Sequence, residues 1–240
     1  MIIAVIPARG GSKRIPRKNI KDFCGRPMIA WSIEAAKASG LFDHIIVTTD
    51  DAEIAEVAKT WGAEVPFIRP AELADDYVGT GAVVKHAVEW FAEHVGMPGF
   101  VCTIYATAPF IRSSDICKGL DMLLSSGSEQ AFTVTTFPSP IQRALRITSS
   151  GRVTMFHPEN YQARSQDLEP AYHDAGQFYW ARSTSILNSP SGFPEDAIPI
   201  ILPRYRVQDI DTLEDWQRAE LIFKALQLSE EEKYEGNNNR

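Results

Sequence analysis

Short runs of β-branched residues alternate with helical patterns over the first 140 residues, and this alternation limits the fold more than any other feature of the sequence. It is typical of successive βαβ units that build a mostly parallel sheet covered by helices. The predicted strands are 2–7, 45–49, 64–68, 100–105 and 131–137. We therefore expect a three-layer, Rossmann-like α/β fold.

Capping residues and apolar spacing predict the helices between these strands. Pro27 suits the first turn of a helix that Gly40 ends in a left-handed conformation. Asp50 or Asp51 caps the next helix, and Gly62 ends it. Apolar residues at helical spacing predict further helices near 84–91, 116–124 and 212–226.

The pattern changes after residue 137. Residues 138–172 are polar and irregular, with one hairpin signal around Ser149-Ser150-Gly151. Strands at 177–181 and 197–202 and the helix at 212–226 return to the α/β pattern. We therefore predict a single domain over 1–228, with 138–172 as an excursion from its core, and a flexible, charged tail over 229–240.

Composition excludes several classes of partner. The 240 residues are 44% hydrophobic, enough for a sizeable core, and their net charge of −7 argues against sequence-independent nucleic-acid binding. The longest apolar runs reach only about seven residues, far short of a membrane span, and no secretory leader is evident at the start of the sequence. Three scattered cysteines predict reduced thiols. We expect a cytoplasmic protein with no nucleic-acid and no membrane partner.

A basic segment follows the first predicted strand. Six of the thirteen residues of 9–21, RGGSKRIPRKNIK, are basic and none is acidic. The loop after the carboxyl end of a central strand is the usual ligand site of such sheets, and Gly10 and Gly11 let backbone N–H groups approach a phosphate. The segment matches neither the P-loop nor GxGxxG spacing. It predicts a polyphosphate site; the alternative is a solvated basic loop.

Two carboxylates precede the last predicted helix. On an extended segment Asp209 and Asp211 point to the same side, with Cα atoms about 7 Å apart, while Ile210 faces the core. Mg²⁺ prefers such carboxylates together with substrate phosphates and water. The alternative is that Asp211 or Thr212 only caps the helix that follows.

Several segments resemble a known family. They are IPARGGSKRIPRKNI, IIVTTDDAEIAEVAKTWGAEV, RPAELADD, YATAPF and DIDTLED. Together they resemble the cytidylyltransferases that make CMP-activated nonulosonic acids, the bacterial CMP-sialic acid (acylneuraminate) synthetases, over residues 2–226. PSPIQRAL and DAGQFYW resemble the branch that activates pseudaminic acid. Tyr105 and Ala175 stand where N-acetylneuraminate enzymes typically have Gln and Asn.

The resemblance implies a nucleotidyltransferase fold and roles for individual residues. The nucleotide-binding residues it implies, with the two glycines, are Arg9, Gly10, Gly11, Ser12, Lys13, Lys18, Asn19, Arg69 and Thr80. The implied catalytic residues are Arg9, Lys18, Asp209 and Asp211, the two aspartates binding Mg²⁺. The expected sugar-binding residues are Tyr105, Thr107, Arg143, Arg164, His173, Gln177 and Tyr179. Surface roles for Arg143, Arg164 and His173, and core packing for Tyr179, are the alternatives.

The activity that the resemblance implies is transfer of CMP from CTP to the anomeric hydroxyl of a nine-carbon keto-acid sugar, pseudaminic acid, with release of pyrophosphate. The alternatives are N-acetylneuraminate, legionaminate or an octulosonate as the acceptor, or a non-catalytic module that binds nucleotide sugars. Retention of both Asp209 and Asp211 argues against the binding module. Apolar residues within 138–172 and the resemblance both predict a homodimer formed through this excursion.

Overall fold

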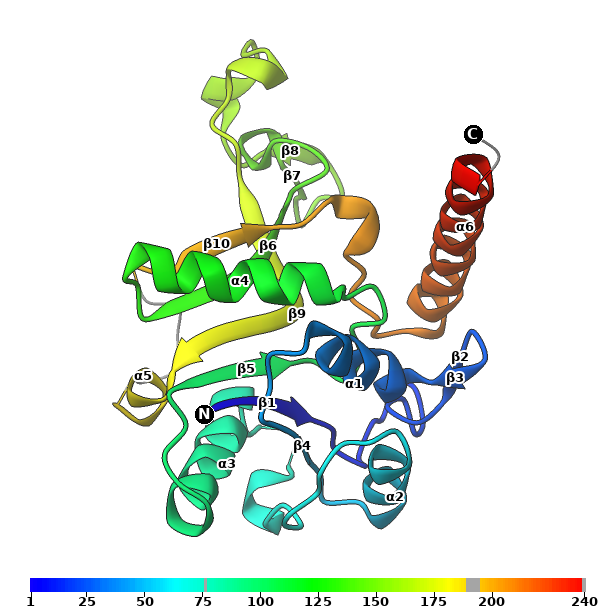
Figure 1. Cartoon of the computed structure of the whole chain (residues 1–240). Helices are drawn as coiled ribbons and strands as arrows, with labels where there is room; N and C mark the ends of the chain where they lie inside the picture. Colours follow the sequence, from blue (N-terminus) through cyan, green and yellow to red (C-terminus); the bar gives the residue numbers. More distant parts are fainter. Residues whose placement is uncertain (76, 189–194, 239–240) are drawn as a thin grey trace.

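A central six-stranded sheet with the strand order β10-β6-β9-β5-β1-β4 organises the computed structural model (Figure 1). The structure describes residues 1–75, 77–188 and 195–238. The strands are β1 (Ile2–Pro7), β4 (His44–Thr48), β5 (Phe100–Ile104), β6 (Gln130–Thr136), β9 (Tyr172–Arg182) and β10 (Ile198–Ile201). Pairings of β1 with β4 and β5, and of β6 with β10, are parallel, whereas β9 is antiparallel to both neighbours. The predicted, mostly parallel α/β sheet is confirmed.

Helices cover both faces of this sheet, which gives the three layers (Figure 1). On one face lie α1 (Met28–Ser39), α2 (Ala52–Thr60) and α4 (Ser113–Ser126); on the other lie α3 (Thr80–His94) and α5 (Ser183–Asn188). Gly40 ends α1 at φ +66° and Asp51 caps α2, both as predicted. Pro27 precedes α1 as its N-cap residue and is not in its first turn.

A third apolar cluster joins the final helix, α6 (Leu213–Asn238), to the edge of the domain. Trp216 and Phe223 of α6 pack edge-on against the buried ring of Phe23, which lies in the small β2 (Asp22–Phe23) and β3 (Arg26–Pro27) ribbon. Ile15 and Ile210, only 1% and 2% exposed, belong to the same cluster. The cluster therefore holds the basic segment and the acidic segment against one helix.

One predicted strand and one predicted helix end are wrong. Residues 64–68 form no strand in the structure, only a single parallel bridge from Glu64 to Ile46, because Pro66 has no N–H to continue a ladder. The last helix does not end near 226 but continues to Asn238, since Glu, Lys and Gln are strong helix formers. Residues 229–238 of the predicted flexible tail are thus helical, and 239–240 lie outside the described residues.

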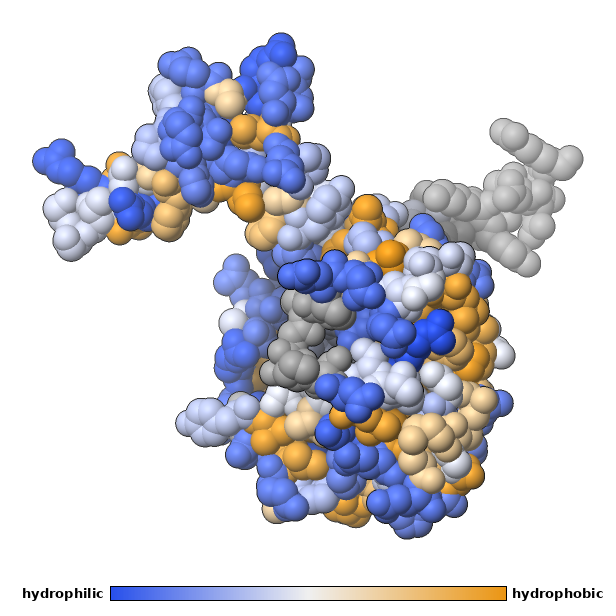
Figure 2. All heavy atoms as spheres, turned by 90° about the vertical axis from the view of Figure 1, so that its left-hand side faces the viewer, coloured by the Kyte–Doolittle hydropathy of each residue, from blue (hydrophilic) through white to orange (hydrophobic). Residues whose placement is uncertain are grey.

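The predicted excursion forms an arm, residues 138–171, that projects from the domain (Figure 1). Its hairpin pairs β7 (Leu145–Ile147) with β8 (Val153–Met155), as predicted. The short 3₁₀ helices are η2 (Ile141–Arg143), η3 (Pro158–Asn160) and η4 (Ser165–Asp167) on the arm, and η1 (Ala71–Leu73) and η5 (Arg204–Arg206) on the domain. Figure 2 shows apolar atoms among the hydrophilic surface of the arm. No helix in the described part of the chain has the length and apolarity to cross a membrane.

Candidate active site

The basic segment leaves the carboxyl end of β1 and is tied down by its own side chains. Asn19, which is buried, donates from its amide to the Arg9 carbonyl at 2.9 Å. The Gly10 N–H donates to Asp50 Oδ1 at 2.9 Å. A Cβ on Gly10 would lie 2.7 Å from Asp51 Oδ2, whereas a Cβ on Gly11 would meet nothing within 4 Å. Close packing thus requires glycine at position 10 but not at position 11.

One of the six cations anchors this segment and does not face the pocket. The Arg17 guanidinium pairs with both carboxylate oxygens of Asp51 and with Glu53. Arg17 and two backbone N–H groups at the start of α2 hold the pKa of Asp51 at about 2, although partial burial opposes the shift. Arg17 therefore joins the basic segment to the helix cap.

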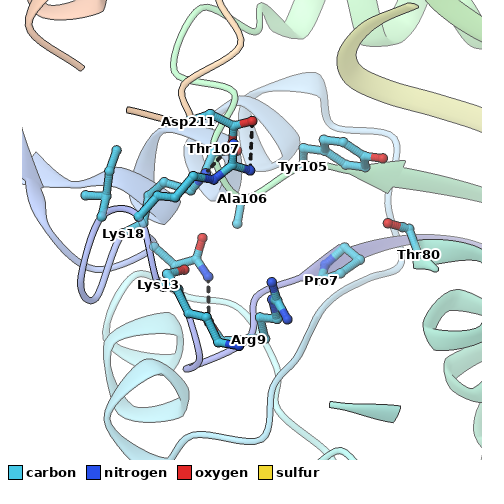
Figure 3. Close-up of a pocket in the computed structure, with 13 residues that line it drawn as sticks. Pro7, Arg9, Lys13, Lys18, Thr80, Tyr105, Ala106, Thr107 and Asp211 are labelled. Atoms are coloured by element: carbon cyan, nitrogen blue, oxygen red, sulfur yellow. Dashed lines mark hydrogen bonds and ion pairs between the residues drawn. The ribbon is translucent and has the colours of Figure 1, made fainter. Parts of the chain in front are cut away.

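Four of the other five basic residues line a pocket of about 240 Å³ (Figure 3). Its lining residues are Pro7, Arg9, Ser12, Lys13, Arg14, Ile15, Lys18, Asn19, Thr80, Tyr105, Ala106, Thr107 and Asp211. Six predicted nucleotide residues are brought together here: Arg9, Ser12, Lys13, Lys18, Asn19 and Thr80. Figure 3 shows Tyr105 and Thr80 across the pocket from Lys18, with Arg9 and Lys13 between them. A concave site with this many cations suits a polyphosphate.

Three predicted nucleotide residues do not line this pocket. Gly10 and Gly11 lie behind it in the same loop. Arg69 is 5% exposed and donates to the Thr48 carbonyl and, at 3.3 Å, to the Thr48 hydroxyl. Burial lowers the pKa of Arg69, an effect that nearby Asp50 opposes and Arg9 reinforces. Arg69 is thus held in the core by Thr48, with its charge close enough to Asp50 and Arg9 for both to affect its pKa.

A capping box at the start of α6 shows whether Asp211 or Thr212 caps this helix. The Thr212 hydroxyl accepts the Asp215 N–H at 3.1 Å, and Asp215 Oδ2 accepts the Thr212 N–H at 2.9 Å. The Thr212 hydroxyl and the Thr212 N–H both donate to the Asp215 carboxylate and lower its pKa. Thr212 is therefore the cap, and Asp211 is left to face the pocket. Ile210 is buried, as predicted from its position between the two carboxylates.

The two carboxylates stand in different electrostatic environments. Asp211 pairs with Arg14 at 2.9 Å and with Lys18 at 3.4 Å, while the Lys18 ammonium donates to the Ile210 carbonyl at 2.7 Å. Burial and the charge of Asp211 raise the pKa of Asp209, and Lys18 and Arg14 only partly oppose this. The charge of Asp211 is therefore balanced by two cations, whereas burial and the neighbouring Asp211 disfavour the ionised form of Asp209.

This donor set fits Mg²⁺. The described residues contain no group of three or more His, Cys, Asp or Glu side chains suited to a metal, so protein ligands alone would not complete a coordination shell. Mg²⁺ commonly uses one or two carboxylates and takes its other ligands from substrate phosphates and water. Asp209 and Asp211 supply the two carboxylates, and a cation between them would relieve the repulsion that raises the Asp209 pKa.

A second, larger pocket of about 900 Å³ adjoins the first through Tyr105 and Thr107, which line both. Its other lining residues are Thr135, Thr136, Pro138, His173, Asp174, Ala175, Gly176, Tyr179, Arg204, Tyr205, Val207, Gln208, Asp209, Ile210 and Arg218. Four predicted sugar residues meet here: Tyr105, Thr107, His173 and Tyr179. Asp211 lines the first pocket and Asp209 the second, so the carboxylate pair lies at their junction.

The other predicted sugar residues lie elsewhere. Gln177 is 3% exposed, and its amide donates to the Arg206 carbonyl. This bond stabilises the backbone directly before the acidic segment. Arg143 and Arg164 are on the arm, where Arg143 contacts the Ser165 hydroxyl and Arg164 pairs with Asp167 at 2.7 Å. Neither arginine lines either of these two pockets.

Sequence reasoning missed four charged lining residues. Arg14 was counted in the basic segment without a role, although its position beside Lys13 could have indicated one. Asp174 lies in the DAGQFYW segment but was not singled out. Arg204 and Arg218 carry no local motif, because they reach the second pocket only through the packing of η5 and α6.

Comparisons with known proteins identify the family of this chain. Residues 3–232 match the family described as Cytidylyltransferase. A pseudaminic acid cytidylyltransferase of Campylobacter jejuni (strain 81-176) is 44% identical over 223 residues, covering 93% of this chain and 96% of the relative. The CMP-N,N'-diacetyllegionaminic acid synthase of Legionella pneumophila is 32% identical, covering 96% and 98%.

A solved structure has the same fold at low sequence identity. It is a CMP-2-keto-3-deoxy-manno-octonic acid synthetase complexed with CTP, with a TM-score of 0.67 at 17% identity, covering 93% of this chain and 98% of that one. This similarity supports the fold alone, whereas the family match spans nearly the whole chain. The chain belongs to the cytidylyltransferase family and is a CTP-dependent nucleotidyltransferase.

Proposed function

We propose that the chain transfers CMP from CTP to the anomeric hydroxyl of a nonulosonic acid, pseudaminic acid, and releases pyrophosphate. One observation carries this proposal: a cationic pocket and a larger polar pocket share a wall, with Asp209 and Asp211 at their junction. A triphosphate in the first pocket would present its α-phosphorus to a hydroxyl group held in the second.

The reaction depends mainly on alignment and charge neutralisation. A sugar hydroxyl is a weak nucleophile and the triphosphate is strongly anionic, so holding both in line lowers the barrier. Arg9, Lys13 and Lys18 neutralise the phosphates and stabilise the leaving pyrophosphate. When bound, Mg²⁺ on Asp209 and Asp211 supplies Lewis-acid polarisation of a phosphoryl oxygen. Asn19 keeps the Arg9 loop in place through its hydrogen bond to the Arg9 carbonyl.

The identity of the sugar rests on the relatives and on the lining of the pockets. A relative 44% identical is named for pseudaminic acid, and others are named for legionaminic and neuraminic acids. The wall shared by the two pockets carries the Tyr105 ring and Thr107, and Ala175 lines the second pocket; the tyrosine ring and the alanine methyl group offer few polar partners to the atoms beside them. Pseudaminate has a C9 methyl group where neuraminate has a hydroxyl, and each hydroxyl left unpaired costs about 10- to 100-fold in kcat/KM.

A competition experiment tests the sugar. With limiting CTP and equal concentrations of pseudaminate and N-acetylneuraminate, we expect CMP-pseudaminate to exceed CMP-neuraminate by about two orders of magnitude. Parallel reactions with legionaminate and an octulosonate test the other acceptors. Comparable yields would refute pseudaminate as the preferred substrate, and no pyrophosphate with any acid would favour the binding module.

Assembly and location belong to the same proposal. The arm exposes Leu145, Ile147, Val153 and Phe156, more apolar surface than a small hairpin can bury, which supports a homodimer formed through it. Cys24, Cys102 and Cys117 are free, which supports the reducing cytoplasm. Light scattering that finds only monomers at micromolar concentration would refute the dimer.

A further inference from the structure

Asp174 lines the second pocket at a bulge in β9. Pairing between β6 and β9 runs from Phe132 with Tyr179 to Val134 with Asp174, so β9 has extra residues over 175–178. The buried Thr133 hydroxyl bonds both the N–H and the carbonyl of Phe178, which stabilises the irregular segment. Such bulges redirect side chains next to functional sites. This one turns Asp174 toward the pocket.

The Asp174 carboxylate is held in one orientation. Its Oδ1 accepts the Gly176 N–H at 2.8 Å, and Gly176 adopts φ +60°, which favours glycine. The Tyr179 hydroxyl donates to both carboxylate oxygens, at 2.8 and 2.7 Å. Two hydrogen bonds from fixed groups therefore aim a carboxylate that is itself exposed to the pocket.

Tyr179 is in turn a fixed donor. Its ring lies 6.1 Å from the Phe132 ring and 5.3 Å from the Tyr105 ring, which restricts its rotation. Burial, and then the neighbouring Tyr105 and Asp174, raise the pKa of Tyr179 well above its usual value. The hydroxyl therefore keeps its proton and continues to donate it to Asp174 throughout the physiological range of pH.

This arrangement leaves Asp174 with acceptor capacity. A carboxylate has about four lone-pair sites, and the Gly176 N–H and the single Tyr179 proton do not fill them. The other charged or titratable residues that line the pocket are His173, Arg204, Asp209 and Arg218, together with the tyrosines Tyr105, Tyr179 and Tyr205. The carboxylate of a sugar acid would be attracted by the two arginines and repelled by Asp174. Asp174 would therefore favour the end of the ligand that carries hydrogen-bond donors.

We propose that Asp174 is a specificity-determining residue that accepts a hydrogen bond from an amide N–H or hydroxyl group of the sugar acid, and that Tyr179 is the positioning residue that orients its carboxylate. This rests on the proposed function only in taking the second pocket as the sugar site. No such role follows from the basic segment or from the metal-binding pair.

Steady-state pyrophosphate release tests the proposal, with CTP and whichever nonulosonic acid the parent protein turns over. We expect Asp174→Ala to lower kcat/KM for the sugar by about 10- to 100-fold, with KM for CTP unchanged. Asp174→Asn, which keeps an acceptor oxygen for Gly176 and Tyr179, should lose less. Asp121→Asn removes the same charge from an exposed site on α4 and should match the parent.

A double-mutant cycle tests the positioning role. We expect Tyr179→Phe to lower kcat/KM for the sugar by about 3- to 10-fold in the parent but to add nothing in the Asp174→Ala background, because the proposal has the hydroxyl act on the sugar through Asp174. An equal loss in both backgrounds would show that Tyr179 contacts the sugar itself and would overturn the positioning role.

Two controls separate the possible failures. If Asp174→Ala melts at a lower temperature or has a changed KM for CTP, Asp174→Asn provides the measurement. Sugar KM values within twofold of the parent for both variants would overturn the proposal. Calorimetric binding of pseudaminate to the parent and to Asp174→Ala tests Asp174 without turnover: a parent that binds the sugar but releases no pyrophosphate contradicts the proposed function, and equal binding by the two proteins contradicts the role of Asp174.

Discussion

Asparagine at position 209 or 211 should have the same effect on turnover and opposite effects on stability. Asp211 is paired with Arg14 at 2.9 Å and Lys18 at 3.4 Å, so Asp211→Asn removes two attractive interactions. Burial and the charge of Asp211 disfavour ionised Asp209, so Asp209→Asn removes a repulsion. Asparagine nearly preserves the shape of aspartate, which isolates the effect of charge.

The expected changes in stability follow from the solvent exposure of these side chains. The Asp211 side chain is 32% exposed, and its partners Arg14 and Lys18 are 68% and 19% exposed. Partly exposed ion pairs contribute about 0.2–1 kcal/mol each, so Asp211→Asn should cost about 1 kcal/mol. In a chain of this size that lowers Tm by about 2–4 °C. Asp209→Asn should leave Tm unchanged or raise it. Both should lose about 10³-fold in turnover, because each removes a metal carboxylate.

Thermal unfolding is measured in EDTA without CTP, and turnover as pyrophosphate release at saturating Mg²⁺. Asp121→Asn on the exposed face of α4 controls for the loss of one negative charge. If Asp209→Asn lowers Tm as much as Asp211→Asn does, the description of the two environments is wrong. If either variant keeps more than a tenth of the parent turnover, the metal-binding role of that carboxylate is refuted.

Three further perturbations test the basic segment. Gly10→Ala should lower the free energy of unfolding by about 1–3 kcal/mol in urea titrations, because its Cβ would lie 2.7 Å from Asp51, whereas Gly11→Ala, with nothing within 4 Å, should match the parent. Lys18→Ala should lower kcat and raise KM for CTP; a change confined to the sugar KM would contradict a triphosphate contact.

The third perturbation is Arg17→Gln, which should raise the pKa of Asp51 from about 2 toward 3.8. Folding depresses the pKa of Asp51. The Arg17–Asp51 pair therefore stabilises the folded state above about pH 4, and this stabilisation is lost as the pH falls toward 2. The shift corresponds to about 2 kcal/mol, which partial exposure reduces to about 1 kcal/mol. A parent–variant difference in unfolding free energy that did not shrink over this range would refute the assignment.

The sequence predicted the fold well because the sheet is built from local patterns. Strands such as β1 and β4 are short runs rich in β-branched residues, and the caps at Gly40 and Asp51 depend on local chemistry. The two errors, the strand at 64–68 and the end of the last helix, also have identifiable local causes. Residues 64–68 look like a strand until Pro66 interrupts the ladder, and α6 continues past 226 because charged residues with high helix propensity need no apolar face.

The two pockets differ in how far the sequence alone can predict them. The basic half is one continuous segment after β1, so its composition alone indicates a polyphosphate site. The second pocket takes residues from β6, β9, η5, α6 and the segment that follows β5, and only tertiary packing brings these together. The β9 bulge that directs Asp174 inward has no periodic signal, because its extra residues read as an ordinary strand. Gln177 was predicted as a ligand for the same reason, yet it faces Arg206.

Packing of α6 explains how a segment near residue 15 and one near residue 210 form one site. Ile15 and Ile210 are each buried next to charged residues, and each inserts into the cluster formed by Phe23, Trp216 and Phe223. Because both isoleucines pack on the same rigid surface, the distance between the cations and the carboxylates is set by apolar contacts and not by the flexible charged side chains themselves. The Lys18 bond to the Ile210 carbonyl, at 2.7 Å, then joins the two segments directly. The last helix is therefore a structural part of the active site, although in the described residues only Arg218 of α6 lines a pocket.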